Sequence, residues 1–242
     1  MIELIDVRKR LGARQILDGM TLRVPKGVNY VLMGPSGTGK SVTLKHVIGI
    51  LRPDSGSVRV DGMEVPTMDH KQLMALRKRM GYLFQNGALI NWLTVFDNVA
   101  LPLREHVKMA KGEVDDRVHE VLQLVGMDHA AGQFPPSISG GMKLRAGLAR
   151  ALVTKPEYVL YDEPNAGLDP IISQQIHELI AEVRDSLHVT GLVVTHSRAC
   201  ATQCGDRIGV IQDGKIALEG SIDEMTTSDN PLAKAFLGTG SD

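Results

Sequence analysis

The chain has 242 residues, of which 43% are apolar and 23% charged, and its net charge is −1. This size and composition suit one globular α/β domain with a full hydrophobic core. The near-zero charge gives no general electrostatic case for a nucleic-acid partner, so we expect none.

Two further classes are disfavoured by the distribution of apolar residues and cysteines. No segment approaches the roughly 20 apolar residues that span a bilayer, and the first six residues contain two acids, unlike a signal peptide. Any membrane role would therefore run through a partner at the cytoplasmic surface. Cys200 and Cys204 would share one face of a helix. We interpret them as thiols of a reducing compartment, in preference to a disulfide or a metal site.

Taken in chain order, the patterns predict strands at residues 2–7, 21–24 and 28–33, and a helix from about 39 to 51. A strand at 57–60, a helix at 72–79 and a buried strand at 80–84 follow. Helices are then predicted at 94–103, 113–125 and 140–152. The last part alternates again, with strands at 158–161, 192–195, 208–211 and 215–218 and helices at 171–187 and 198–204. We expect an α/β core, about 1–86 and 155–242, interrupted by a helical insertion of about 87–154.

A glycine-rich loop between a predicted strand and a predicted helix fits the phosphate-binding pattern G-x-x-x-x-G-K-[ST] without a mismatch. Its residues are Gly34, Pro35, Ser36, Gly37, Thr38, Gly39, Lys40 and Ser41, and we add Val42 as the next nucleotide contact. Glycines let backbone N–H groups approach phosphates, and the following helix adds its positive dipole end. Lys40 would contact the β- and γ-phosphates, and Ser41 would supply an oxygen to Mg²⁺.

Two adjacent acids close the apolar run at residues 158–161. Asp162, at the strand end, is placed to hold Mg²⁺, and Glu163 could polarise an attacking water as general base. A pair of solvated acids at a turn is the alternative. That alternative loses weight because the phosphate-binding loop lies in the same chain.

The segment Ser139, Gly140, Gly141 and Met142, followed by Arg145 and an Ala-Arg-Ala-Leu run, resembles the signature motif of ABC ATPases. The resemblance implies a P-loop NTPase core of the RecA type with an antiparallel β subdomain and a helical insertion. It further implies that these four residues grip the γ-phosphate of ATP held by a second, identical subunit. The usual motif ends in glutamine, where this chain has Met142.

Other family motifs follow in the expected order along nearly the whole chain. Gln85 matches the glutamine that contacts Mg²⁺ where core and insertion join. Residues 166–169, ending in Asp169, match the loop that crosses the dimer interface, and His196 matches the histidine that contacts the γ-phosphate. The resemblance thus implies ATP and Mg²⁺ as ligands, with Glu163, His196, Lys40 and Gln85 in catalysis.

One position departs from the family. An aromatic residue upstream of the phosphate loop usually stacks on adenine, and here that position is Leu11. Stacking on a base is worth roughly 1–3 kcal/mol. We therefore expect looser adenine recognition, with ATP and GTP binding similarly in competition.

Residues 83–89 and 94–106, together with Met142, look like the ATPases of Mla/Mce-type lipid transporters. This resemblance implies a peripheral ATPase dimer at the cytoplasmic face of the inner membrane, below an integral MlaE-like permease. The system would move phospholipid or related compounds between the two membranes. A small MlaB-like regulatory subunit and a periplasmic Mce-domain lipid-binding protein are further partners that the resemblance leaves open. An apolar cluster of Leu89, Ile90, Trp92 and Leu93 could dock the permease or pack the insertion's own core.

Three alternatives share parts of this pattern. An importer ATPase for amino acids or another polar solute would have the same catalytic residues. A soluble ABC-type ATPase acting on DNA or ribosomes typically carries a long coiled-coil insertion or two ATPase units, and this chain shows neither. A catalytically inactive binding module is disfavoured because Lys40, Asp162, Glu163 and His196 are all present.

Overall fold

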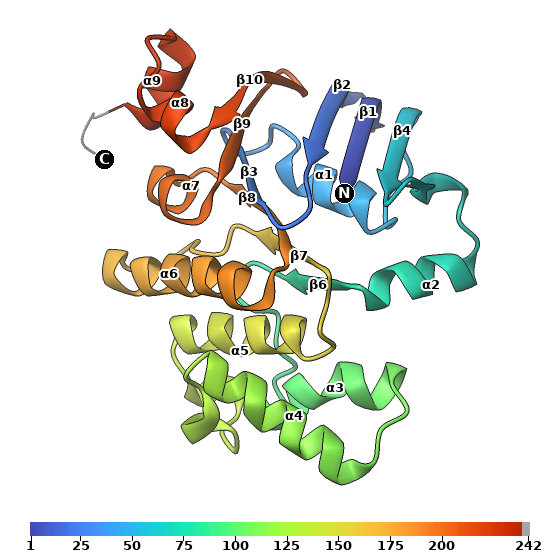
Figure 1. Cartoon of the computed structure of the whole chain (residues 1–242), viewed down its shortest axis with the longest axis vertical. Coiled ribbons are helices and arrows are strands. Elements are labelled where there is room, and N and C mark those ends of the chain that lie inside the picture. The colour runs from blue at the N-terminus through green and yellow to red at the C-terminus, as the bar shows by residue number, and fades with distance from the viewer. Residues whose placement is uncertain (239–242) are drawn as a thin grey trace.

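The largest element of the fold is a mixed sheet with the strand order β10-β9-β3-β8-β7-β6 (Figure 1). The computed structural model describes residues 1–238. The strands are β3 (Asn29–Met33), β6 (Met80–Leu83), β7 (Tyr158–Asp162), β8 (Thr190–Thr195), β9 (Arg207–Gln212) and β10 (Lys215–Ser221). Neighbours from β9 to β6 pair in parallel, and β10 adds an antiparallel edge. Strands β3 and β8 are buried at every residue, which is why their sequences are continuous apolar runs.

A second, antiparallel sheet has the order β2-β1-β4-β5. Its strands are β1 (Ile2–Leu11), β2 (Arg14–Val24), β4 (Ser55–Val60) and β5 (Met63–Glu64). The sequence patterns predicted a shorter first hairpin, because they ended one strand at residue 7 and began the other at 21. Pairing instead continues to Leu11 opposite Arg14. The extension carries exposed ion pairs such as Arg8 with Asp18 on its outer face, while Leu17 and Met20 of β2 are buried in the core.

Helix α1 (Lys40–Val47) packs between the two sheets, in an apolar core that includes Leu44, Val47, Tyr30 and Leu160. The predicted helix ran to residue 51, but the structure ends it at Val47. Gly49 follows with φ +66°, and a Cβ there would lie 2.5 Å from Leu73. Helix α2 (His70–Lys78) then leads into β6.

The chain between β6 and β7 is helical and forms one end of the molecule, opposite the antiparallel sheet (Figure 1). It contains α3 (Val95–His106), α4 (Lys111–Leu124) and α5 (Gly140–Leu152). Thr94 and Ser139 cap α3 and α5 through their hydroxyls. The helices share a second core with α6 (Pro170–Leu187), α7 (Arg198–Cys204) and the adjoining sheet face.

Helices α8 (Ile222–Thr226) and α9 (Pro231–Leu237) complete the described chain and were not predicted. Cys200 and Cys204 are buried on α7 as free thiols with their Sγ atoms 3.9 Å apart. Within residues 1–238, no helix combines the length and apolar character that crossing a membrane requires.

Candidate ATP-binding and hydrolysis site

Four neighbouring parallel strands deliver the predicted catalytic residues to one edge of the large sheet. The phosphate-binding loop follows β3, His196 follows β8, Glu163 follows β7 and Gln85 lies just beyond β6. The carboxyl ends of parallel strands are where α/β sheets bind ligands. A cavity of about 410 Å³ opens here, lined by Arg14, Ile16, Ser36, Gly37, Gly39, Lys40, Ser41, Val42, Gln85, Glu163 and His196.

The loop before α1 is shaped for close backbone approach to phosphates. Gly37 and Gly39 have φ values of +79° and +106°, in a region that favours glycine. A Cβ on Gly39 would also lie 2.7 Å from Leu17 and 3.2 Å from the Ile16 carbonyl oxygen. The Lys40 side chain is only 5% exposed, and its Nζ donates to the carbonyl oxygens of Gly34 and Pro35 at 2.7 and 3.0 Å. The loop therefore holds its lysine over the backbone cradle.

Oxygen donors converge on Asp162 at the end of β7. Ser41 Oγ donates to Asp162 Oδ1 at 2.7 Å, and the Tyr82 hydroxyl donates to Oδ2 at 2.9 Å. Burial, and next the Asp162 charge, raise the pKa of Tyr82, which keeps the phenol protonated as a donor. Tyr82 was not predicted as part of the site. Its signal was a hydroxyl in the middle of an otherwise apolar strand.

Glu163 lies between Lys40 and His196. Its Oε1 is 3.3 Å from Lys40 Nζ, while Oε2 is 2.9 Å from His196 Nδ1 and accepts from the His196 backbone N–H at 3.2 Å. Glu163 has φ +48°, a left-handed conformation uncommon for non-glycine residues. Its N–H is fixed by the Val194 carbonyl. Such strain is maintained where neighbours determine the backbone, and here it directs a carboxylate to the phosphate loop.

The segment after Gln85 is tied to α5. Asn86, Gly87 and Ala88 all have positive φ, and the half-buried Arg150 donates to the Gly87 and Ala88 carbonyl oxygens at 2.8 Å each. Burial lowers the pKa of Arg150. A Cβ on Gly147 of the same helix would lie 2.8 Å from the Gly87 Cα. The segment that follows Gln85 is therefore both hydrogen-bonded to α5 and closely packed on it.

We expect Gly147→Ala to displace this loop, because the new methyl group would meet backbone atoms of Gly87. Overpacking of this kind costs about 1–3 kcal/mol of unfolding free energy. Urea denaturation and phosphate-release rates would measure the loss of stability and of turnover. Gly132→Ala is the matched control, because nothing lies within 4 Å of a Cβ at that position. Equal behaviour of the two variants would refute the contact.

The predicted signature residues lie apart from the cavity. Ser139 is the N-cap of α5, and its Oγ accepts from the Met142 N–H at 3.3 Å. A Cβ on Gly140 would lie 3.3 Å from the side chain of Leu168, in the loop before α6. A Cβ on Gly141 would lie 2.5 Å from the side chain of Ile172 on α6. Asp169 caps that helix by accepting from the Ile171 and Ile172 N–H groups. None of residues 139–142 lines the phosphate-loop cavity, and neither does Asp169.

Leu11 does not line the cavity either. It is the last residue of β1 and is 43% exposed. Arg14 and Ile16, at the start of β2, line the cavity instead. They were missed because β2 was predicted to begin only at residue 21.

Fold and site together define a P-loop ATPase of the cassette type. A family model described as ABC transporter matches residues 17–166. The chain is 43% identical to the probable ribonucleotide transport ATP-binding protein mkl of Mycobacterium leprae, over 98% of this chain and 68% of that protein. It is 38% identical to the intermembrane phospholipid transport system ATP-binding protein MlaF of Escherichia coli K12, over 98% of this chain and 88% of that protein.

Solved structures of ABC transporter cassettes have the same fold as this chain. A bacterial ABC transporter cassette solved as a dimer superposes with a TM-score of 0.84 at 31% identity, covering 92% of this chain and 99% of that one. A post-hydrolysis state of such a dimer, bound to ADP and Pi, gives 0.83 at the same identity and coverage. The chain belongs to the ABC transporter family. The predicted fold class and the predicted ATPase class are confirmed.

Proposed function

We propose that this ATPase powers the movement of phospholipid or related hydrophobic compounds between inner and outer membranes, as one of two identical subunits below a membrane permease. The observation that carries the proposal is the similarity to MlaF over 88% of that protein's length. The mycobacterial relatives named for ribonucleotide transport support a second candidate, the movement of ribonucleotides. This chain spans about two thirds of their length.

The site chemistry follows from the contacts around the cavity. Lys40 and the backbone of residues 34–41 would hold the phosphates of ATP. Ser41 and Asp162, already joined at 2.7 Å, have oxygens of the kind that Mg²⁺ prefers, and Gln85 in the cavity wall would supply a third. Mg²⁺, when bound, neutralises charge on the phosphate oxygens. Glu163 would accept a proton from the attacking water, and His196 would orient that carboxylate and donate to the γ-phosphate.

A second subunit is needed because the phosphate-loop cavity and the signature residues 139–142 lie apart in one chain. Ser139 and Gly140 are exposed at the start of α5, next to the loop that ends in Asp169, and Ile171 beside them is 72% exposed. A serine and two glycines at a helix N-terminus suit the binding of a phosphate. In a head-to-tail homodimer they would complete the partner's cavity.

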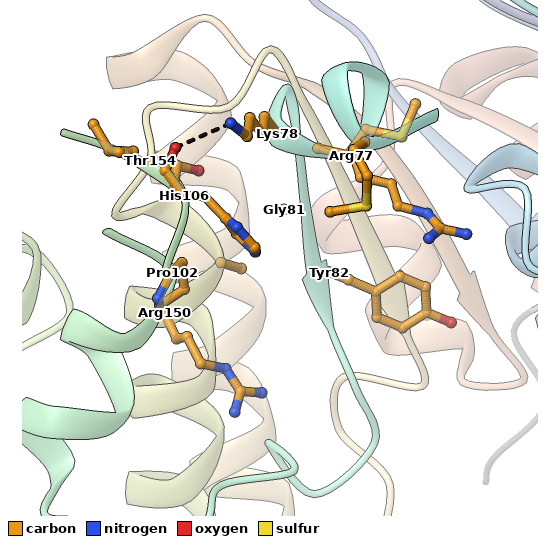
Figure 2. A pocket seen from close by; sticks show the side chains of 12 residues that line it. Arg77, Lys78, Gly81, Tyr82, Pro102, His106, Arg150 and Thr154 are labelled. Carbon is orange, nitrogen blue, oxygen red and sulfur yellow. Dashed lines mark hydrogen bonds between the residues drawn. The ribbon is translucent and has the colours of Figure 1, made fainter. Parts of the chain in front are cut away.

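A groove between core and insertion suits the permease. The cavity has a volume of about 410 Å³ and is lined by α2 and β6 on one side and by α3 and α5 on the other (Figure 2). Arg77, Lys78, His106 and Arg150 line it beside apolar residues, and among the described residues no acid does. Its positively charged lining suits a permease segment that carries a carboxylate.

Two residues that line the groove also form hydrogen bonds to parts of the nucleotide site. Tyr82 lines it and donates to Asp162, while Arg150 lines it and holds the loop after Gln85. We propose that the core, about 1–86 and 155–242, and the insertion, about 87–154, act as two units whose relative position ATP binding changes. A permease helix in the groove would follow that change. The chain would then sit peripherally at the cytoplasmic face of the inner membrane.

Trp92 is an exposed aromatic residue of the insertion, and we include it as a separate candidate contact for the permease. Its side chain is 80% exposed, so it does not pack the insertion's own core, whereas Leu89 packs against that core. We expect Trp92→Asp to reduce permease-stimulated ATPase about tenfold, as loss of an exposed aromatic anchor does. Nucleotide binding to the isolated chain should stay within about twofold. Leu187→Asp, at another exposed apolar residue, is the control. Loss of ATP binding in Trp92→Asp would contradict docking.

Copurification of the chain with its membrane partner, followed by mass spectrometry of bound small molecules, tests the substrate class. Bound phospholipid would support lipid transport. Bound ribonucleotide in the membrane subunit without phospholipid would favour the second candidate. The same preparation would show whether MlaB-like or Mce-domain proteins belong to the complex.

A further inference from the structure

The start of β2 forms part of the wall of the nucleotide cavity. Ile16 lies against the loop, since its Cγ2 is 3.1 Å from the position of a Cβ on Gly39. Arg14 stands two residues earlier and lines the same cavity. Alternate residues of a strand share a face and are about 7 Å apart. Arg14 is therefore displaced along the strand from the phosphates, toward the space where a nucleotide would extend its base.

The Arg14 guanidinium is exposed and has no hydrogen-bond or ion-pair partner among residues 1–238. The other arginines of this hairpin are engaged. Arg8 pairs with Asp6 and Asp18, and Arg10 donates to the Ala13 carbonyl. Arg14 is thus the cation of the hairpin that is free to contact a ligand, and it lines a ligand cavity.

Two features favour the base over the phosphates as its contact. The phosphate end already has Lys40 and the glycine-rich backbone. Among the described residues no Phe, Tyr or Trp lines the cavity, and Leu11, opposite Arg14 in the hairpin, does not line it. A guanidinium is planar, delocalised and weakly hydrated, and it stacks on aromatic faces as a lysine ammonium does not.

We propose that Arg14 is the base-binding residue of this ATPase and stacks its guanidinium on the nucleobase, with Ile16 packing beside it. Stacking on a ring face does not distinguish the hydrogen-bonding edges of adenine and guanine. The site therefore binds adenine and guanine nucleotides with similar affinity. Their shared affinity depends on Arg14. The inference concerns nucleotide binding by the chain itself and does not depend on which compound is transported.

The test is a calorimetric titration of the full chain with ADP, GDP and pyrophosphate, each with Mg²⁺, so that hydrolysis does not interfere. Arg14→Ala should weaken ADP and GDP binding about tenfold and leave pyrophosphate binding unchanged. Arg14→Lys, which keeps the charge without the plane, should behave like Arg14→Ala. Arg23→Ala removes an exposed arginine from the other end of the same strand and should change nothing.

Three results would overturn the proposal. An equal loss of pyrophosphate affinity in Arg14→Ala would make Arg14 a phosphate contact. Full recovery of ADP affinity in Arg14→Lys would reduce its role to charge alone. ADP affinity in Arg14→Ala equal to that in Arg23→Ala would remove Arg14 from the site. Thermal melting of each variant verifies that the hairpin still folds.

Discussion

Glu163→Gln is expected to bind ATP like the wild-type chain and to hydrolyse it at least about 100-fold more slowly, since general base catalysis typically contributes that much. The carboxylate lies 3.3 Å from Lys40 Nζ and 2.9 Å from His196 Nδ1, at the cavity where the phosphates would lie. Glutamine keeps the size and the hydrogen-bonding oxygen but cannot accept the proton from water. The phosphate-binding backbone is unaffected.

Phosphate release and equilibrium ATP binding should be measured on the same preparations of this variant. Glu178→Gln is a suitable control, because Glu178 is exposed on α6 and accepts a hydrogen bond from Gln174 of the same helix. Turnover within about tenfold of wild type would remove Glu163 from the role of base.

Ser139→Arg should abolish hydrolysis while leaving ATP binding intact, with a loss of about 100-fold or more, comparable to loss of a preorganised phosphate or oxyanion contact. Ser139 does not line the chain's own nucleotide cavity, so the effect has to arise in the partner's site. The long cation would block the close approach that the exposed serine and Gly140 permit.

Mixing two inactive variants separates this account from simple damage. In a head-to-tail dimer of Ser139→Arg with Lys40→Ala, one site combines an intact phosphate loop with an intact signature. The mixture should therefore recover activity that neither variant has alone. Absence of recovery, with both chains folded and dimerising, would contradict a shared site.

Local patterns predicted the buried strands of the core, and the structure brings the proposed catalytic residues together at the ends of those strands. The buried parallel strands β3, β7 and β8 are apolar runs that end at a glycine, at an acid pair and before a histidine, respectively. The proposed catalytic residues follow the ends of these strands. The outer part of the first hairpin was missed, because shifts in the pairing register interrupt the alternation of its apolar residues and its end is polar. That omission also hid Arg14 and Ile16.

Contacts between distant parts of the chain were outside the reach of local patterns. The bond from Tyr82 to Asp162 joins residues of two strands, and Arg150 reaches back across more than 60 positions to Gly87 and Ala88. The end of α1 likewise depends on Gly49 fitting against Leu73 of α2. Each of these contacts joins two elements that are distant in the sequence, so the pattern of residues along one element does not predict it.

The most direct test of the proposed function is ATP-driven phospholipid transfer by the chain reconstituted with its copurified permease in vesicles. With the wild-type chain and ATP, we expect transfer of labelled phospholipid. With Glu163→Gln we expect no transfer. We expect no uptake of labelled ribonucleotide by the vesicles in either case. Ribonucleotide uptake that requires ATP, without any movement of phospholipid, would contradict the proposal.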